Sequence, residues 1–338
     1  MTIPDRDNAR VRADRRGKAR IDVGGLALGC SQLGNLYRAV SDEDARATLD
    51  TAWELGVRYF DTAPHYGLGL SERRVGAGLG ARPRDAYVLS TKVGRLLEPV
   101  EVVEGLDDGG FVVPATHRRV WDFSRDGIRR SLSESLERLG VGRVDIVYLH
   151  DPDDHWDEIL ETGYPALDEL RAEGVVAAVG AGMNQSPMLA DLVRHTDVDV
   201  VMLAGRYTLL EQDSLDDLLP VCEERGVAIV VAGVFNSGLL ARPHPAEDAR
   251  YDYADAPPEL VRRARAIAAV CERHGTTLPA AAIAFPLAHP AVVSVCVGAR
   301  SAEQVERNIA LYREPIVPDL WSELKAEGLL REDAPVPT

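Results

Sequence analysis

Cysteine is scarce in this 338-residue chain, and its four cysteines show no Cys-x-x-Cys spacing. Scattered cysteines favour reduced thiols over disulfides or a zinc site, which suits a cytoplasmic protein. Positive charge is also in short supply, because 38 lysines and arginines face 54 aspartates and glutamates, for a formal net charge of -16. Nucleic acids and anionic membranes both favour positive surface, so neither is expected as a partner.

Long apolar runs are absent from the sequence, and none reaches the ~18 residues that a membrane span needs. The first residues, MTIPDRDNARVRADRRGKAR, are charged throughout and lack the apolar core of a secretory signal. We expect residues 1–24 to form an arm that frays or lies on the surface. Residues 315–338 contain Pro315, Pro318, Pro335 and Pro337, and we expect them to wrap the surface and then fray.

Between these ends, short β-branched runs alternate with longer helical patterns. The expected strands are Leu26–Leu28, Val57–Phe60, Ala86–Thr91, Val144–Leu149, Val175–Val179, Val198–Leu203, Val227–Val231 and Val292–Val297. The expected helices include Asp42–Leu55, Ser71–Leu79, Arg125–Leu139, Pro165–Glu173, Asp213–Arg225 and Pro258–His274. Continuous apolar strands alternating with helices indicate a parallel sheet that is covered on both faces. Eight such strands over residues 25–314 predict an α/β fold of one (β/α)8 TIM barrel.

A doubly wound open sheet is the structural alternative. It would need a glycine fingerprint for nucleotide binding after the first strand, and the sequence GLALGCSQLGN lacks that spacing. Two segments, Val93–Phe123 and Ala232–Pro257, exceed ordinary connections and follow the third and seventh strands. In a barrel they would emerge at the C-terminal ends of the strands, where barrel enzymes place their sites.

Four titratable residues lie at the ends of these strands or just past them. Asp61 follows the second strand, Tyr66 lies five residues further on, Lys92 ends the third strand, and His150 ends the fourth. A nearby ammonium such as Lys92 lowers the pKa of a tyrosine, and a buried lysine needs an anion, which Asp61 supplies. His150 can orient a substrate oxygen. Each residue alone fits a structural role as well, and the conjunction of all four indicates a pocket that polarises a carbonyl or a hydroxyl.

No metal-ligand spacing such as H-E-x-x-H is present, and no nucleophile stands out. A carbonyl that takes only a proton from the protein must receive its hydride from a cofactor.

The phrase FDTAPHYGLGLSE, a strand ending in T-K and a strand ending in L-H-D together resemble the aldo-keto reductases. That family is a (β/α)8 barrel, and its catalytic tetrad maps onto Asp61, Tyr66, Lys92 and His150. HDPDDHW, GMNQ, AGRYTLLEQ and NSGLLA resemble the aldose 1-dehydrogenases within the family. This resemblance implies oxidation of a sugar hemiacetal at C1 to the lactone, with NAD or NADP taking the hydride.

The resemblance also implies which residues bind the cofactor. Asn184 and Gln185 would contact the nicotinamide carboxamide, with Arg206 nearby, and Phe235 would replace the tyrosine that stacks on the ring. The pyrophosphate would lie on Asn236, Ser237, Gly238 and Leu239. The adenosine end would meet Arg300, Ser301, Gln304 and Asn308. Positions that hold cations in strongly NADP-selective members are Gly298 and Gln304 here, which favours NAD or dual use. His65 and Trp121 are the expected sugar contacts, because an aromatic face packs on the C–H surface of a sugar.

Two other functions stay open at this point. One is an NADPH-dependent reductase of aldehydes or ketones in a biosynthetic pathway. The other is a cofactor-binding regulatory subunit that keeps the barrel and turns over negligibly. The sequence leaves the particular substrate, the direction of reaction and the oligomeric state undetermined.

Overall fold

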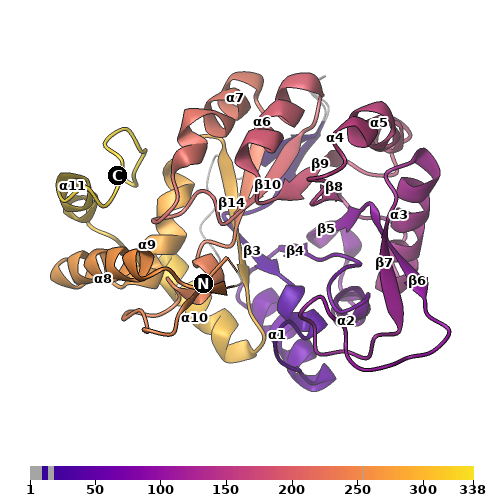
Figure 1. The fold of residues 1–338 in the computed structure, drawn as a ribbon, viewed down its shortest axis with the longest axis horizontal. Coiled ribbons are helices and arrows are strands. Elements are labelled where there is room, and N and C mark those ends of the chain that lie inside the picture. Colours follow the sequence, from indigo (N-terminus) through magenta and orange to yellow (C-terminus); the bar gives the residue numbers. More distant parts are fainter. Residues whose placement is uncertain (1–9, 14–18, 253) are drawn as a thin grey trace.

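The computed structural model describes residues 10–13, 19–252 and 254–338. Eight parallel strands close into a barrel with helices around it, which confirms the predicted fold (Figure 1). Around the barrel the strands run in chain order: β3 (Leu26–Gly29), β4 (Tyr59–Asp61), β5 (Val88–Val93), β8 (Ile146–His150), β9 (Ala178–Met183), β10 (Val200–Ala204), β11 (Ala228–Ala232) and β14 (Val292–Gly298).

Most strands begin later and end later in the sequence than the apolar runs suggested. The largest shift is at β9, which was expected at Val175–Val179 and runs from Ala178 to Met183. Val176 is buried in the connection that precedes the strand, so it adds apolar character without joining the sheet. At the other end, β5 and β8 continue through the polar residues Lys92 and His150. The strand ends are therefore the part of the barrel that carries chemistry.

Helices follow the strands and form the outer layer: α1 (Asp42–Glu54), α2 (Leu70–Leu79), α3 (Arg125–Leu139), α4 (Trp156–Glu158), α5 (Tyr164–Ala172), α6 (Ser186–His195), α7 (Leu218–Arg225), α8 (Pro258–Arg273), α9 (Leu278–Ala284), α10 (Ala302–Arg313) and α11 (Pro318–Ala326). Side-chain caps mark where several begin. The hydroxyl oxygens of Ser41, Ser124 and Ser301 accept hydrogen bonds from backbone N–H groups at the starts of α1, α3 and α10.

The apolar core has two main parts. One fills the barrel interior and includes Ile146, Val200 and Val230, while the larger one lies between the strands and the helices. Two tyrosines also point into the interior, where the hydroxyls of Tyr59 and Tyr148 lie 3.1 Å apart. These side chains therefore pack the centre of the barrel.

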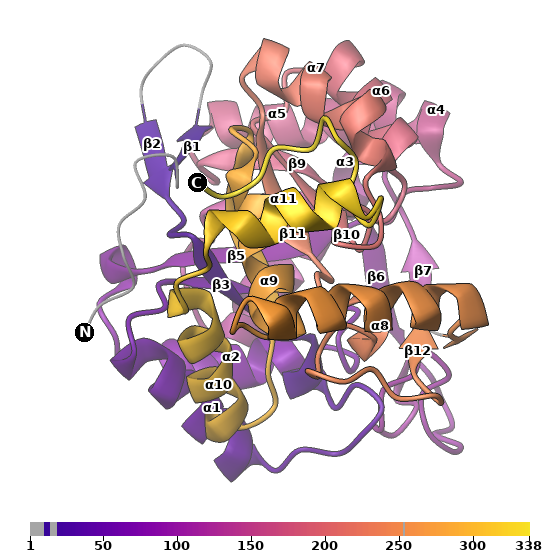
Figure 2. The same cartoon turned by 90° about the vertical axis from the view of Figure 1, so that its left-hand side faces the viewer.

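Hairpins lie at both ends of the barrel (Figure 2). β1 (Arg10–Ala13) pairs with β2 (Ala19–Asp22), and β1 lies close to β9 and β11. At the other end, the long segment after β5 contains β6 (Arg95–Pro99) paired with β7 (His117–Trp121). The segment after β11 contains β12 (Arg250–Tyr251) and β13 (Ala254–Asp255). The rest of the expected N-terminal arm, residues 1–9 and 14–18, lies outside the described residues.

The C-terminal segment packs against the protein along most of its length, in agreement with the expected wrapping, while fraying of its last residues stays a prediction. Helix α11 buries Leu320, Trp321 and Leu324 and packs against α8, which the helical spacing of these apolar residues explains. Beyond it, Ala334 is 1% exposed, and the backbone N–H of Arg331 donates to the Gln212 side chain at 2.9 Å. Among the described residues, no helix combines the length and the apolar character that crossing a bilayer requires.

Candidate active site

A buried ion pair lies at the C-terminal end of the barrel. Asp61 and Lys92 come from the adjacent strands β4 and β5, and each is 2% exposed. Lys92 Nζ lies 2.6 Å from Asp61 Oδ2 and also donates to the carbonyl of Thr62 at 3.0 Å. The hydroxyl of Ser90 donates to Asp61 Oδ1 at 2.7 Å. The two buried charges thus satisfy each other, as a buried ion pair requires.

Tyr66 lies beside this pair, in the loop between β4 and α2. Lys92 Nζ is 4.8 Å from the centre of the Tyr66 ring, and the His150 ring lies 5.8 Å away at nearly a right angle. A close backbone contact holds the loop, because a Cβ on Gly67 would lie 2.2 Å from the carbonyl oxygen of Gly34. Gly67 also has a φ of +63°, which other residues adopt at a cost. The structure thus brings together all four residues that the strand ends predicted.

The S-E pair that follows the tyrosine has a structural role. The Ser71 hydroxyl donates to the carbonyl of Cys30 at 2.7 Å and lies 2.8 Å from the Thr62 hydroxyl. Glu72 is fully buried, accepts a hydrogen bond from Thr91 at 2.7 Å and pairs with Arg138 at 2.5 Å. These bonds tie α2 to strand ends on both sides of β4. Residues 60–72 therefore supply both the reactive tyrosine and the hydrogen bonds that fix its loop in place.

The charges at the site set which groups titrate. Burial lowers the pKa of Lys92, but the Asp61 carboxylate and the Tyr66 oxygen together outweigh burial and hold that pKa above its usual value. Burial raises the pKa of Tyr66 above 10, and Lys92 only partly opposes this. Lys92 acts to lower the tyrosine pKa, as expected, but burial outweighs it and the net shift is upward, because residue spacing does not reveal burial. Tyr66 is a neutral phenol at neutral pH.

The two histidines of the site are uncharged. Burial and the cations Arg95 and Lys92 lower the pKa of His150 well below 6.5. The same causes, with Arg119, lower the pKa of His65 to about 2. His150 Nδ1 is buried and has no hydrogen-bond partner among the described residues. A neutral imidazole at this place can donate a hydrogen bond to a substrate oxygen without moving a charge.

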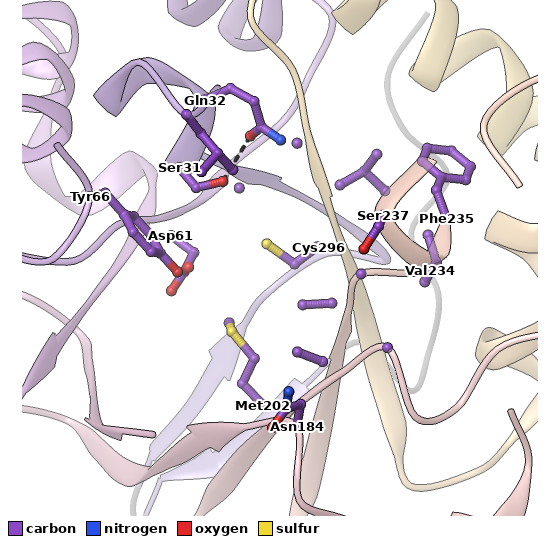
Figure 3. Close-up of a pocket in the computed structure, with 18 of the residues that line it drawn as sticks. Ser31, Gln32, Asp61, Tyr66, Asn184, Met202, Val234, Phe235, Ser237 and Cys296 are labelled. Atoms are coloured by element: carbon purple, nitrogen blue, oxygen red, sulfur yellow. Dashed lines mark hydrogen bonds between the residues drawn. The ribbon is translucent and has the colours of Figure 1, made fainter. Parts of the chain in front are cut away.

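A cavity of about 760 Å³ opens over the barrel end, within the range of small-molecule and cofactor sites. Asp61 and Tyr66 lie together on one side of it (Figure 3). Phe235 and Ser237 lie on the opposite side, with Cys296 between. The side with the ion pair is formed by β4, β5 and β8, and the other by the loops after β10, β11 and β14. The cavity therefore joins a reactive end to a second, longer binding region.

The loop after β11 forms part of that second region. The N–H groups of Asn236, Gly238 and Leu239 donate to carbonyls within the loop, so they are not presented to the cavity as expected. Asn236 donates from its side chain to Gly205 at 3.1 Å, and its Oδ1 is buried with no partner among the described residues. An Arg206–Asp252 ion pair at 2.8 Å joins this loop region to the end of β10. Asn236 lines the cavity, and an unpaired acceptor on a lining residue fits a ligand that donates hydrogen bonds, such as a nucleotide cofactor.

Three arginines line the far end of the cavity: Arg38 before α1, Arg300 after β14 and Arg307 on α10. None of them has a carboxylate within ion-pair distance among the described residues. Burial lowers the pKa of Arg300, and the nearby charge of Arg38 lowers it further. Gln304 also lines this end and accepts a hydrogen bond from the Arg300 backbone at 3.1 Å. Arginines without acidic partners suit a phosphorylated ligand.

Thirteen of the eighteen predicted site residues line the cavity, and five do not: Trp121, Gln185, Leu239, Ser301 and Asn308. Ser301 caps α10, and Asn308 donates to the carbonyl of Gly298 at 3.2 Å, so both hold the loop after β14 in shape. Trp121 is 42% exposed on β7, where it stacks on Phe123. These three residues do not line the cavity, and their expected ligand contacts stay a prediction.

Other lining residues were not predicted: Ser31, Gln32, Arg38, Phe111, Asp151, Met202, Cys296 and Arg307. Ser31, Gln32 and Asp151 follow strand ends, so the rule that found the tetrad could have found them. Met202 and Cys296 lie within strands, where the sequence does not distinguish them from ordinary core residues, so nothing in the sequence marks them as part of a site.

Comparison with known proteins agrees with this geometry. Residues 25–327 match the Aldo/keto reductase family. The chain is 50% identical to a D-threo-aldose 1-dehydrogenase of Pseudomonas sp, across 92% of this chain and 96% of that one. It is 40% identical to a pyridoxal 4-dehydrogenase of Microbacterium luteolum, across 93% and 96%. A solved aldo-keto reductase of Bacillus halodurans, in its holo form, superposes with a TM-score of 0.71 at 27% identity, across 94% and 95%. The chain therefore belongs to the aldo/keto reductase family and is an NAD(P)-dependent oxidoreductase acting on CH–OH groups.

Proposed function

We propose that this protein oxidises an aldose at C1 to the lactone, with Tyr66 as the proton-transfer residue. The observation that carries the proposal is the buried Asp61–Lys92 pair beside Tyr66, next to the neutral His150. An aldose as substrate is supported by the D-threo-aldose 1-dehydrogenase that is 50% identical to the chain.

Each residue of the site has a separate task in this reaction. A ring N–H of neutral His150 donates to the C1 oxygen and orients it between the His150 and Tyr66 rings. The phenolate of Tyr66 takes the proton of the C1 hydroxyl, and Lys92 stabilises that phenolate. Asp61 holds Lys92 in place and charged. The oxidised nicotinamide nucleotide, which residues such as Asn184 and Phe235 would hold, would supply the hydride acceptor; loss of a hydride from C1 and of the hydroxyl proton to Tyr66 turns the C1–O bond into the carbonyl of the lactone.

The test measures absorbance at 340 nm after the purified protein is mixed with each aldose of a panel, with NAD and NADP in separate reactions. L-Fucose, D-arabinose and L-galactose belong on the panel. Pyridoxal is added because one relative is a pyridoxal 4-dehydrogenase. A rise with an aldose supports the proposal and shows which cofactor is used. No rise with any sugar, together with NADPH consumption by simple aldehydes, would replace it with the reductase function. Cofactor binding without turnover in either direction would indicate a regulatory subunit.

The pH dependence of the two directions should differ. Because burial raises the pKa of Tyr66, the phenolate is a minor form whose fraction grows about tenfold per pH unit below that pKa. We expect log kcat/KM for oxidation to rise with a slope of about 1 between about pH 7 and 9, whereas reduction uses the abundant phenol and stays flat. His65 and His150 stay neutral and add no inflection between about pH 5 and 8. Initial rates across this range check it, and a flat oxidation profile would argue against Tyr66 as the base.

A further inference from the structure

Asp151 brings a carboxylate to the cavity wall directly after His150. Its φ of +39° is unusual for a residue with a side chain, and its backbone N–H donates to the carbonyl of Gly182 at 2.9 Å. The chain thus turns sharply where β8 ends, and the Asp151 side chain lines the cavity. Its Oδ2 lies 3.6 Å from His150 Nε2. Neither the tetrad nor the cofactor end accounts for this carboxylate.

Arg95, from β6, fixes the Asp151 side chain. Its Nη2 lies 2.5 Å from Asp151 Oδ2, and its guanidinium sits 4.2 Å from the centre of the Trp121 ring. The arginine side chain is only 13% exposed, so stacking and burial keep it from swinging away. Asp151 Oδ1 accepts no hydrogen bond from the residues that the structure describes. One oxygen is therefore anchored, and the other is available to a ligand.

His65 complements Asp151 with a donor. It lines the cavity, its ring lies 5.4 Å from that of His150, and its Nδ1 lies 3.4 Å from Arg95 Nη1. Arginine can only donate, so Nδ1 is the acceptor, and the proton of the neutral ring is on Nε2. An N–H donor of His65 and a carboxylate acceptor of Asp151 thus belong to residues that line the same cavity as Tyr66 and His150.

A hydroxyl group both donates and accepts, so this donor and acceptor match one. We propose that Asp151, anchored by Arg95 and complemented by His65, recognises the hydroxyl on the carbon next to the reacting one, and so makes a 2-hydroxyl a requirement for efficient turnover. The inference rests on the proposed oxidation of an aldose, which carries such a hydroxyl. A substrate without it would cover Asp151 Oδ1 and leave that oxygen without a hydrogen-bond donor.

Substrate pairs that differ by one hydroxyl test this inference. Glycolaldehyde and acetaldehyde form the pair for reduction, and an aldose with its 2-deoxy analogue forms the pair for oxidation. We expect the wild-type protein to favour the hydroxylated member by about 10- to 100-fold in kcat/KM, as for a hydrogen bond to a charged group. Asp151→Asn keeps the size of the side chain and tolerates a positive φ, but it removes the charged acceptor. In this variant the ratio should fall close to 1.

Asp154→Asn is the matched control, because it removes the same charge from an exposed residue of the same loop and should keep the wild-type ratio. A wild-type ratio near 1, or an unchanged ratio in Asp151→Asn, overturns the inference. Equal losses on both members of a pair in Asp151→Asn would also overturn it, since they indicate a role in folding or in the tetrad. The reduction pair does not depend on aldose oxidation. A preference for glycolaldehyde without any oxidation of aldoses would therefore contradict the proposed function and leave this inference standing.

Discussion

Tyr66→Phe should lower kcat by about 10²- to 10⁴-fold, the usual contribution of a positioned proton-transfer group. The substitution removes one oxygen from a ring that faces the cavity and leaves the Asp61–Lys92 pair intact. The nicotinamide nucleotide should still bind with nearly unchanged affinity, because the residues expected to hold it lie on the other side of the cavity. Stopped-flow absorbance at 340 nm gives the rate, and titration calorimetry gives the cofactor affinity.

Tyr59→Phe is a suitable control for this experiment. It also removes a buried phenol oxygen, but Tyr59 lies in the barrel interior, hydrogen-bonded to Tyr148 and Ser90. Its loss should affect stability more than kcat. Full activity in Tyr66→Phe would contradict the assignment of the proton-transfer residue, and so would an equal loss of kcat in both variants.

Lys92→Met should affect both stability and turnover. It leaves the Asp61 carboxylate buried with only the Ser90 hydroxyl as a donor, and removing one partner of a buried ion pair typically costs about 3–5 kcal/mol. It also removes the cation that partly offsets the raised pKa of Tyr66, so the phenolate becomes rarer and oxidation slows further. Urea unfolding, followed by circular dichroism, measures the first effect, and initial rates measure the second.

The double variant Asp61→Asn with Lys92→Met separates the two effects. It removes both charges, and an uncharged pair of similar volume is often as stable as the ion pair that it replaces. We expect most of the lost stability to return while kcat stays as low as in the single variant. Recovery of activity together with stability would show that Lys92 acts only through the fold.

The strand ends carried most of what the sequence could predict about the site. Continuous apolar runs indicated eight parallel strands, and in a barrel their C-terminal ends must converge. That geometry alone brings Asp61, Lys92 and His150 together, without knowledge of any loop. The contact between Gly34 and Gly67 joins residues that are far apart in the sequence, and no local sequence pattern indicates it. The exact position of Tyr66 could therefore not be predicted.

Burial and loop packing account for the features that sequence reasoning missed. The pKa of Tyr66 depends on how much protein surrounds it, which spacing does not reveal. Trp121 was expected beside a sugar because it is aromatic and lies in a long loop, but β6 and β7 pair into a hairpin that places it against Arg95. The C-terminal prolines suggested a tail that wraps the surface and then frays, but they gave no sign of helix α11, whose three buried apolar residues hold it against the protein.

The backbone contact between Gly34 and Gly67 constrains how this enzyme could evolve or be redesigned. Neither glycine has a side chain to offer a substrate, yet any side chain at Gly34 would lie 2.6 Å from the Tyr66 carbonyl carbon. In a directed-evolution library, both positions should prove as intolerant as the tetrad itself. Surface positions on the β6–β7 hairpin carry no such constraint, so they are where diversity can be introduced to retarget specificity without disturbing the reactive centre.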